Sequence, residues 1–141
     1  MNLALQSVQR FKVWQRSVEL VVLSYTLSGS FPSDERFGLI AQVRRAATSV
    51  PANIAEGFGR WNSREFAHFL AIASGSLREL QTHLIVATRL DYLPNASAQP
   101  ALDAIDQFSK MLYRMRQRVL ENARRSEQHP QPRRNAMASV V

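Results

Sequence analysis

Two pairs of Glu and His in this sequence of 141 amino acids are candidates for a metal site, because the two members of each pair lie about one helical turn apart. A di-iron site in a helical bundle needs the spacing Glu-x-x-His on two helices and a further Glu on each of the other two. Glu65 and His68 have this spacing, but Glu79 and His83 are four positions apart instead of three. The motif is therefore incomplete, and we expect no metal and no other cofactor.

The other patterns that could do chemistry are also incomplete. Residues 74–76 read Ser-Gly-Ser, but they lack the strand-to-turn-to-helix context of a hydrolase nucleophile. Gly57 and Gly59 lack the later glycine and the lysine of a phosphate-binding loop. Glu56 has no second carboxylate, nucleophile or metal ligand placed beside it by spacing. Cysteine is absent, which excludes thiol chemistry. We therefore expect a protein that is not an enzyme.

Basic residues are the strongest chemical feature of the chain. Lys and Arg number 18 against 11 Asp and Glu, and the net charge of +7 favours anionic partners. No helix-turn-helix, zinc-finger or RNA-recognition signature is present, so we expect salt-sensitive contacts with the backbone of RNA or DNA. The candidate residues are a strip with a spacing of four, Lys110, Arg114 and Arg118, and a second cluster of Arg44, Arg45, Arg60 and Arg64.

One alternative to nucleic-acid binding stays open at this point. A charged helix face is often only solvated, so the strip could serve solubility alone. The protein would then be a scaffold for protein-protein interaction with no nucleic-acid ligand.

Four stretches of the chain have apolar residues three or four positions apart, which is the period of one face of a helix. These stretches predict four helices that carry the residues named above. We expect an all-α fold, an antiparallel up-down four-helix bundle over residues 1–125, followed by a disordered basic tail over 126–141. Pro51 predicts a kink in the second helix. The first predicted helix runs from Phe11 to an end near Gly29 and Pro32, and the second from an N-cap at Ser33 to Gly57 and Gly59. The third has its N-cap at Asn62 or Ser63 and carries apolar residues to Ala87. After a loop from Asp91 to Pro100, the fourth carries apolar residues from Ile105 and ends at about Arg125.

The first predicted helix carries two apolar stripes. The main stripe is expected to face the core, and the second would leave that helix apolar over more of its surface than a monomer needs to bury. We therefore expect the protein to associate with itself, with an imperfectly polar surface as the alternative. The main stripe is Phe11, Trp14, Val18, Val21 and Tyr25, and the second is Val13, Leu20, Leu23 and Leu27.

No apolar run reaches the length of a membrane span, and residues 1–11 lack the pattern of a secretory signal. We therefore expect a cytoplasmic protein that does not contact a membrane.

A resemblance appears in the segment from Phe37 to Leu80. Its most specific part is the run Asn-Ile-Ala-Glu-Gly at residues 53–57. The segment is similar to a family of four-helix bundles first noticed as reading frames inside intervening sequences of bacterial 23S rRNA genes. That family also includes the accessory protein of diversity-generating retroelements. The resemblance covers roughly Phe11 to Leu120, and its motif residues here are Gln42, Arg44, Arg45, Ser49, Asn53, Glu56, Gly57, Arg60, Ser76 and Glu79.

The resemblance implies a small bundle that assembles as a homopentamer with a basic surface. In the retroelement branch it further implies binding of nucleic acid and of a reverse transcriptase. For Asn53 and Glu56 we expect a structural role, in a hydrogen-bond network with Arg44, Arg60 or Glu79.

Overall fold

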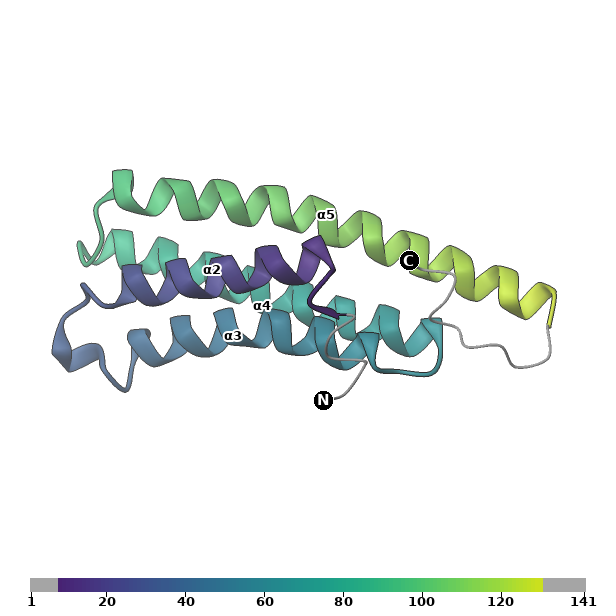
Figure 1. Cartoon of the computed structure of the whole chain (residues 1–141). Coiled ribbons are helices and arrows are strands. Elements are labelled where there is room, and N and C mark those ends of the chain that lie inside the picture. Colours follow the sequence, from purple (N-terminus) through teal and green to yellow (C-terminus); the bar gives the residue numbers. More distant parts are fainter. Residues whose placement is uncertain (1–7, 131–141) are drawn as a thin grey trace.

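The computed structural model describes residues 8–130 and shows four α-helices, with no strand in that range. The helices are α2 (Lys12–Ser28), α3 (Leu39–Phe58), α4 (Ser63–Arg89) and α5 (Asn95–Gln128), and the short 3-10 helix η1 (Ser33–Glu35) lies between α2 and α3. The connections between successive α-helices lie at alternate ends of the bundle (Figure 1). The predicted all-α class is confirmed.

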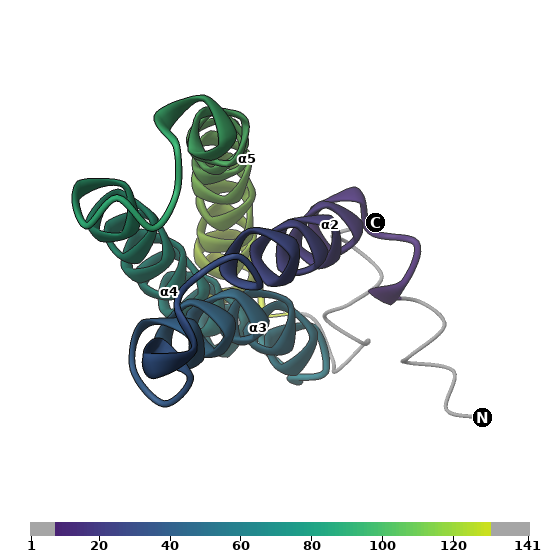
Figure 2. The ribbon, with the colours of Figure 1, turned by 90° about the vertical axis from the view of Figure 1, so that its left-hand side faces the viewer.

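Each helix packs against two others, so the four helices form a closed bundle. α2 packs against α3 and α5, and α4 packs against α3 and α5. Viewed from the end, the four helices surround a common core (Figure 2). The predicted apolar face of α4 is buried except for half-buried Phe69, and the predicted face of α5 is buried throughout: Ile105, Phe108, Leu112, Met115 and Val119.

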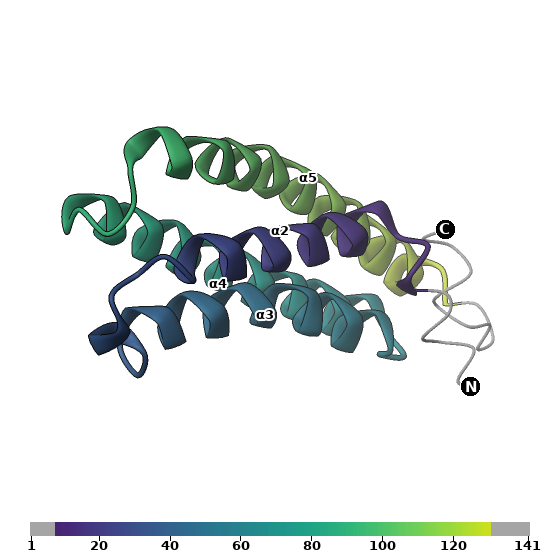
Figure 3. The same cartoon turned by 60° about the vertical axis from the view of Figure 1, so that its left-hand side comes forward.

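The core face predicted for the first helix is wrong. Figure 3 shows α2 lying between α5 and α3. The side chains that α2 buries there are Val13, Leu20 and Leu27 of the second stripe, together with serines. The main stripe flanks the core instead: Trp14, Val18 and Val21 are half-buried, with Trp14 and Val21 packed against the core, and Tyr25 is exposed.

Two buried serines explain why the core face of α2 differs from the predicted one. Ser17 and Ser24 are fully buried, and their hydroxyls donate to carbonyls of their own helix, to Trp14 O at 2.6 Å and to Leu20 O at 2.7 Å. A hydroxyl that is paired in this way is buried without the cost of an unmade hydrogen bond. A hydrophobicity pattern counts these two positions as polar and therefore misses the true core face.

The second helix begins at Leu39, so the N-cap predicted at Ser33 is wrong. Residues 33–35 form η1 instead. The Glu35 carboxylate accepts a hydrogen bond from Leu39 N at 2.7 Å and another from the Tyr92 hydroxyl at 3.3 Å. An acid therefore stabilises the positive end of α3 from the turn that precedes the helix.

The loop predicted from Asp91 to Pro100 is also too long. α5 begins at Asn95, and Pro100 lies inside it. Ala98 and Ala101 on either side of Pro100 are fully buried, so their packing offsets the backbone hydrogen bond that proline cannot make. α5 extends to Gln128, beyond the predicted end near Arg125, and residues 131–141 of the predicted tail lie outside the described residues.

α3 runs through Pro51 without interruption, and the bend predicted there stays a prediction. The N-cap predicted for the third helix is confirmed, since the Asn62 side chain accepts a hydrogen bond from Glu65 N at 2.8 Å. None of the described helices has the length and apolar character needed to span a lipid bilayer.

Gly57 allows α3 and α4 to approach closely. A Cβ at this position would lie 2.7 Å from Phe69 Cβ and 2.9 Å from Phe66 Cδ2, both too close for carbon atoms. A Cβ at Gly75 would meet nothing within 4 Å, so Gly75 is not needed for a close approach of helices, although a glycine beside a serine within a helix suggests one. The close contact belongs to Gly57.

We expect opposite effects from alanine at these two glycines. Gly57→Ala should lower the free energy of unfolding by about 1–3 kcal/mol, because the methyl group overpacks the α3–α4 contact. Gly75→Ala should raise it by about 0.5–1 kcal/mol, because alanine favours the helix at an open position. Urea unfolding monitored by circular dichroism measures both values. A Gly57→Ala variant as stable as Gly75→Ala would contradict the close contact.

Candidate nucleic-acid interface

The charge of the molecule is concentrated in one half of the bundle. We call the segments 8–18, 54–70 and 107–130 the basic half; they lie toward the end that carries the α3–α4 turn and the last turns of α5 (Figure 1). The basic half holds 11 Lys and Arg against 4 Glu, whereas the segments 19–53 and 71–106 hold 5 Arg against 7 acidic residues. The protein therefore has one strongly positive half and one slightly negative half.

The predicted strip lies in the basic half. Lys110, Arg114 and Arg118 are all exposed on α5. Within residues 8–130 none of the three takes part in an ion pair. Arg116, between them in sequence, is half-buried and its Nε donates to the carbonyl of Ala67 at 3.2 Å. The strip therefore presents three cations to solvent while Arg116 attaches α5 to α4.

The second predicted cluster is divided by the structure. Arg44 and Arg45 lie near the start of α3, and Arg60 and Arg64 lie at the α3–α4 turn. At a rise of 1.5 Å per residue, the helix between them separates the two pairs by on the order of 20 Å. The four arginines therefore do not form one surface, and only the second pair belongs to the basic half.

Each arginine of the first pair has a structural partner. Arg44 lies over the Tyr25 ring at 4.5 Å, and its Nε donates to Ser28 Oγ at 3.0 Å. Arg45 pairs with Glu79 at 2.7 Å and donates to Gln42 Oε1 at 2.9 Å. These contacts tie α3 to α2 and to α4, so we assign Arg44 and Arg45 to the fold.

The second pair is partly neutralised. Arg60 pairs with Glu56, one helical turn before it, and lies over the Phe69 ring at 4.8 Å. Arg64 donates through Nε and Nη2 to the two carboxylate oxygens of Glu127. This hydrogen bond lowers the pKa of the Glu127 carboxyl below its usual value. Both arginines keep N–H groups free of these partners, since a guanidinium carries five donors.

The remaining motif residues form a polar network between α3 and α4. Asn53 Nδ2 donates to Ser49 O at 2.8 Å and to Ser49 Oγ at 3.0 Å. The Ser49 and Ser76 hydroxyls are 2.7 Å apart and share a hydrogen bond across the two helices. The predicted partner of Glu56 is confirmed as Arg60, whereas Asn53 bonds to Ser49 and to neither Arg44 nor Glu79. The motif therefore holds the two helices together.

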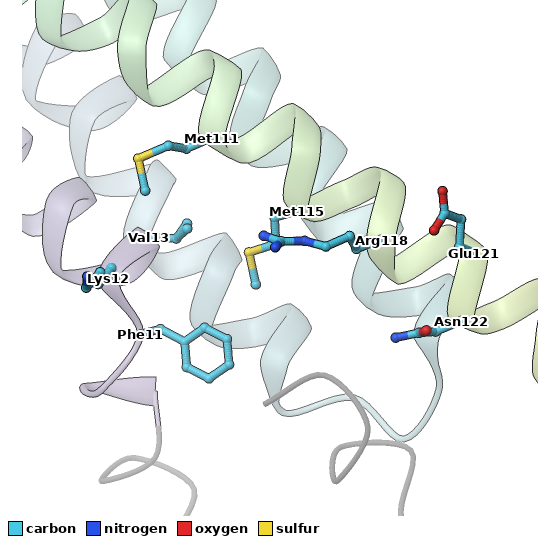
Figure 4. A pocket seen from close by; sticks show the side chains of 8 residues that line it. All are labelled: Phe11, Lys12, Val13, Met111, Met115, Arg118, Glu121 and Asn122. Atoms are coloured by element: carbon cyan, nitrogen blue, oxygen red, sulfur yellow. The ribbon is translucent and has the colours of Figure 1, made fainter.

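A cavity between the start of α2 and α5 adjoins the strip. It measures about 480 Å³ and has an apolar side formed by Phe11, Val13, Met111 and Met115 (Figure 4). The side chain of Arg118 reaches toward it (Figure 4). The polar lining residues are Lys12, Arg118, Glu121 and Asn122. Sequence patterns gave no signal for this cavity, because it depends on how two distant segments pack.

Comparison with known proteins agrees with the resemblance seen in the sequence. The family described as 23S rRNA-intervening sequence protein matches residues 9–114. The match covers most of the chain, so the chain belongs to this family. A search of curated proteins found no match.

Proposed function

We propose that this member of the 23S rRNA-intervening sequence protein family is a non-enzymatic, oligomeric bundle that binds the phosphate backbone of RNA or DNA. The observation that carries the proposal is the basic half, with 11 cations against 4 acids. The description of the family, which refers to an intervening sequence of 23S rRNA, supports a role related to RNA in general terms.

The exposed strip on α5 suits phosphate in both geometry and charge. Arginine presents planar donor forks that match two phosphate oxygens at once. Lys110, Arg114 and Arg118 are exposed and lack acidic partners in the described part of the chain. Binding by such residues releases counterions and does not read bases, so affinity would fall steeply with salt. Three cations give weak binding, which an oligomer would strengthen by repeating the strip.

Self-association is the second part of the proposal, and the outer face of α2 is its proposed surface. Val22 on this face is 62% exposed and Tyr25 is 44% exposed. Trp14, Val18 and Val21 beside them are half-buried, so this side of α2 carries an apolar stripe, bordered by exposed Gln15, Glu19 and Thr26. Apolar patches of this kind mark interaction surfaces in soluble proteins. The number of five subunits and a reverse transcriptase as a further partner rest on the family resemblance alone.

Three further predictions belong to this proposal. An antiparallel up-down course is supported by the connections at alternate ends (Figure 1). A bend in α3 is supported by Pro51 within it. The cytoplasm is the proposed location because the proposed ligands occur there.

The competing function is a scaffold for other proteins, with the outer face of α2 as the binding surface and the charge serving solubility. It predicts a protein partner that is retained after nuclease treatment. Backbone binding instead predicts that nuclease releases the associated material.

Replacing the strip should weaken binding to every nucleic acid. We expect Lys110, Arg114 and Arg118, changed together to alanine, to reduce affinity about 10-fold or more and to lower the slope of log affinity against log salt by about 2–3. Fluorescence anisotropy with an RNA duplex and a single strand over a salt series measures both quantities.

The matched control removes the same charge from the other half. Arg36, Arg78 and Arg89 are exposed there, and their joint change to alanine should leave most of the affinity. An equal loss of affinity in both triple variants would show that binding depends on net charge alone, and it would contradict a specific role of the strip.

A charge on the outer face of α2 should break the oligomer. We expect a molar mass near five times the 16.0 kDa of one chain and a smaller species for Val22→Glu, because a carboxylate is costly to bury at an apolar contact. Light scattering coupled to size exclusion measures the mass. Ile72→Glu, at a position 39% exposed on α4, is the control and should keep the native mass. A monomeric native protein would contradict this part of the proposal.

A further inference from the structure

Two aromatic side chains are almost fully exposed, one at each end of the bundle. Phe37, between η1 and α3, is 88% exposed, and Trp61, in the α3–α4 turn, is 84% exposed. Burying a side chain of this size is worth on the order of 2–3 kcal/mol. Neither residue therefore contributes its apolar surface to the fold of the single chain.

The two aromatic residues lie in halves of opposite net charge. Phe37 lies in the half where acidic residues outnumber arginines, and Arg36 lies over its ring at 5.5 Å. Trp61 lies between Arg60 and Arg64 in the basic half, where these two arginines pair with Glu56 and Glu127. A polyanion would be attracted to the half that carries Trp61 and not to the half that carries Phe37.

The turn that presents Trp61 is held in place on both sides. Arg60 N donates to the Gly57 carbonyl at 3.1 Å, and the Asn62 side chain caps α4 through Glu65 N at 2.8 Å. The neighbouring arginines are held by Glu56 and Glu127. The backbone that carries the indole is therefore held in place, so binding a partner costs little backbone freedom.

We propose that Trp61 stacks against an unpaired nucleobase of the bound nucleic acid, an inference that rests on the proposed function. The exposed indole face offers the stacking surface, and Arg60 and Arg64 offer their remaining N–H donors to the phosphates on either side of that base. Bases inside a duplex are stacked on each other and are not available to an indole. The protein therefore prefers single strands, or unpaired loops of a structured RNA, over continuous duplex.

The test compares Trp61→Ala with Phe37→Ala, the equally exposed residue at the opposite end. The probes are a short oligouridylate, a short oligothymidylate and an RNA duplex of the same length. Trp61→Ala should bind the single strands about 5-fold or more weakly, because stacking of one base on an aromatic ring is worth about 1–3 kcal/mol. Its duplex affinity and its salt slope should equal those of the native protein, since no charge is lost. Phe37→Ala should bind all three probes as the native protein does.

Tryptophan emission gives a second, direct readout, because the chain holds only two tryptophans, Trp14 and Trp61. Single strands should quench the native emission. Trp61→Phe should bind single strands at intermediate affinity, and the emission of its remaining Trp14 should not change.

The outcomes separate this inference from the proposed function. If the native protein binds none of the probes, the proposed function fails and stacking fails with it. If it binds and Trp61→Ala binds single strands equally well, backbone binding stands and the stacking inference is overturned. Equal losses with single strand and duplex, or a changed molar mass of Trp61→Ala, would assign Trp61 to structure or assembly and also overturn it.

Discussion

The bundle is built around the close contact between α3 and α4. It requires Gly57, because any side chain there would meet Phe66 and Phe69 at distances below van der Waals contact. The polar network of Ser49, Asn53 and Ser76 holds the same two helices together farther along. Because these helices approach so closely at this end, the turn between them is short and places Arg60, Trp61 and Arg64 at one end of the bundle.

The elements that the sequence predicts well are those whose apolar faces contain few polar exceptions. α4 and α5 bury the predicted stripes because a 3.6-residue period of large apolar side chains has one stable way to pack. The apolar pattern predicts the wrong core face for α2 because Ser17 and Ser24 are part of the true one. Their burial depends on hydrogen bonds within the helix, which composition does not show. The prediction of a single arginine cluster is wrong for a different reason, because residues of one sequence motif can lie at opposite ends of a helix.

The uneven distribution of charge matters more for binding than the net charge. A net charge of +7 spread over the surface would attract polyanions from all sides. Here almost all of the excess lies in one half, so a polyanion approaching the protein is oriented before it makes contact. In an oligomer built through the outer face of α2, each subunit would contribute its own basic half, and many weak phosphate contacts would act together.

The motif residues that carry the resemblance and the residues proposed to bind overlap only at Arg60. Gln42, Arg45 and Glu79 make contacts within and between α3 and α4, and Asn53 and Gly57 support the same pair of helices. Lys110, Arg114, Arg118 and Trp61 lie outside the motif and have no comparable role in packing. The motif residues therefore account for contacts between the helices, whereas the proposed choice of ligand depends on exposed side chains that the bundle does not need. A binding surface of this kind can be removed without loss of the fold, because its side chains contribute little to the core.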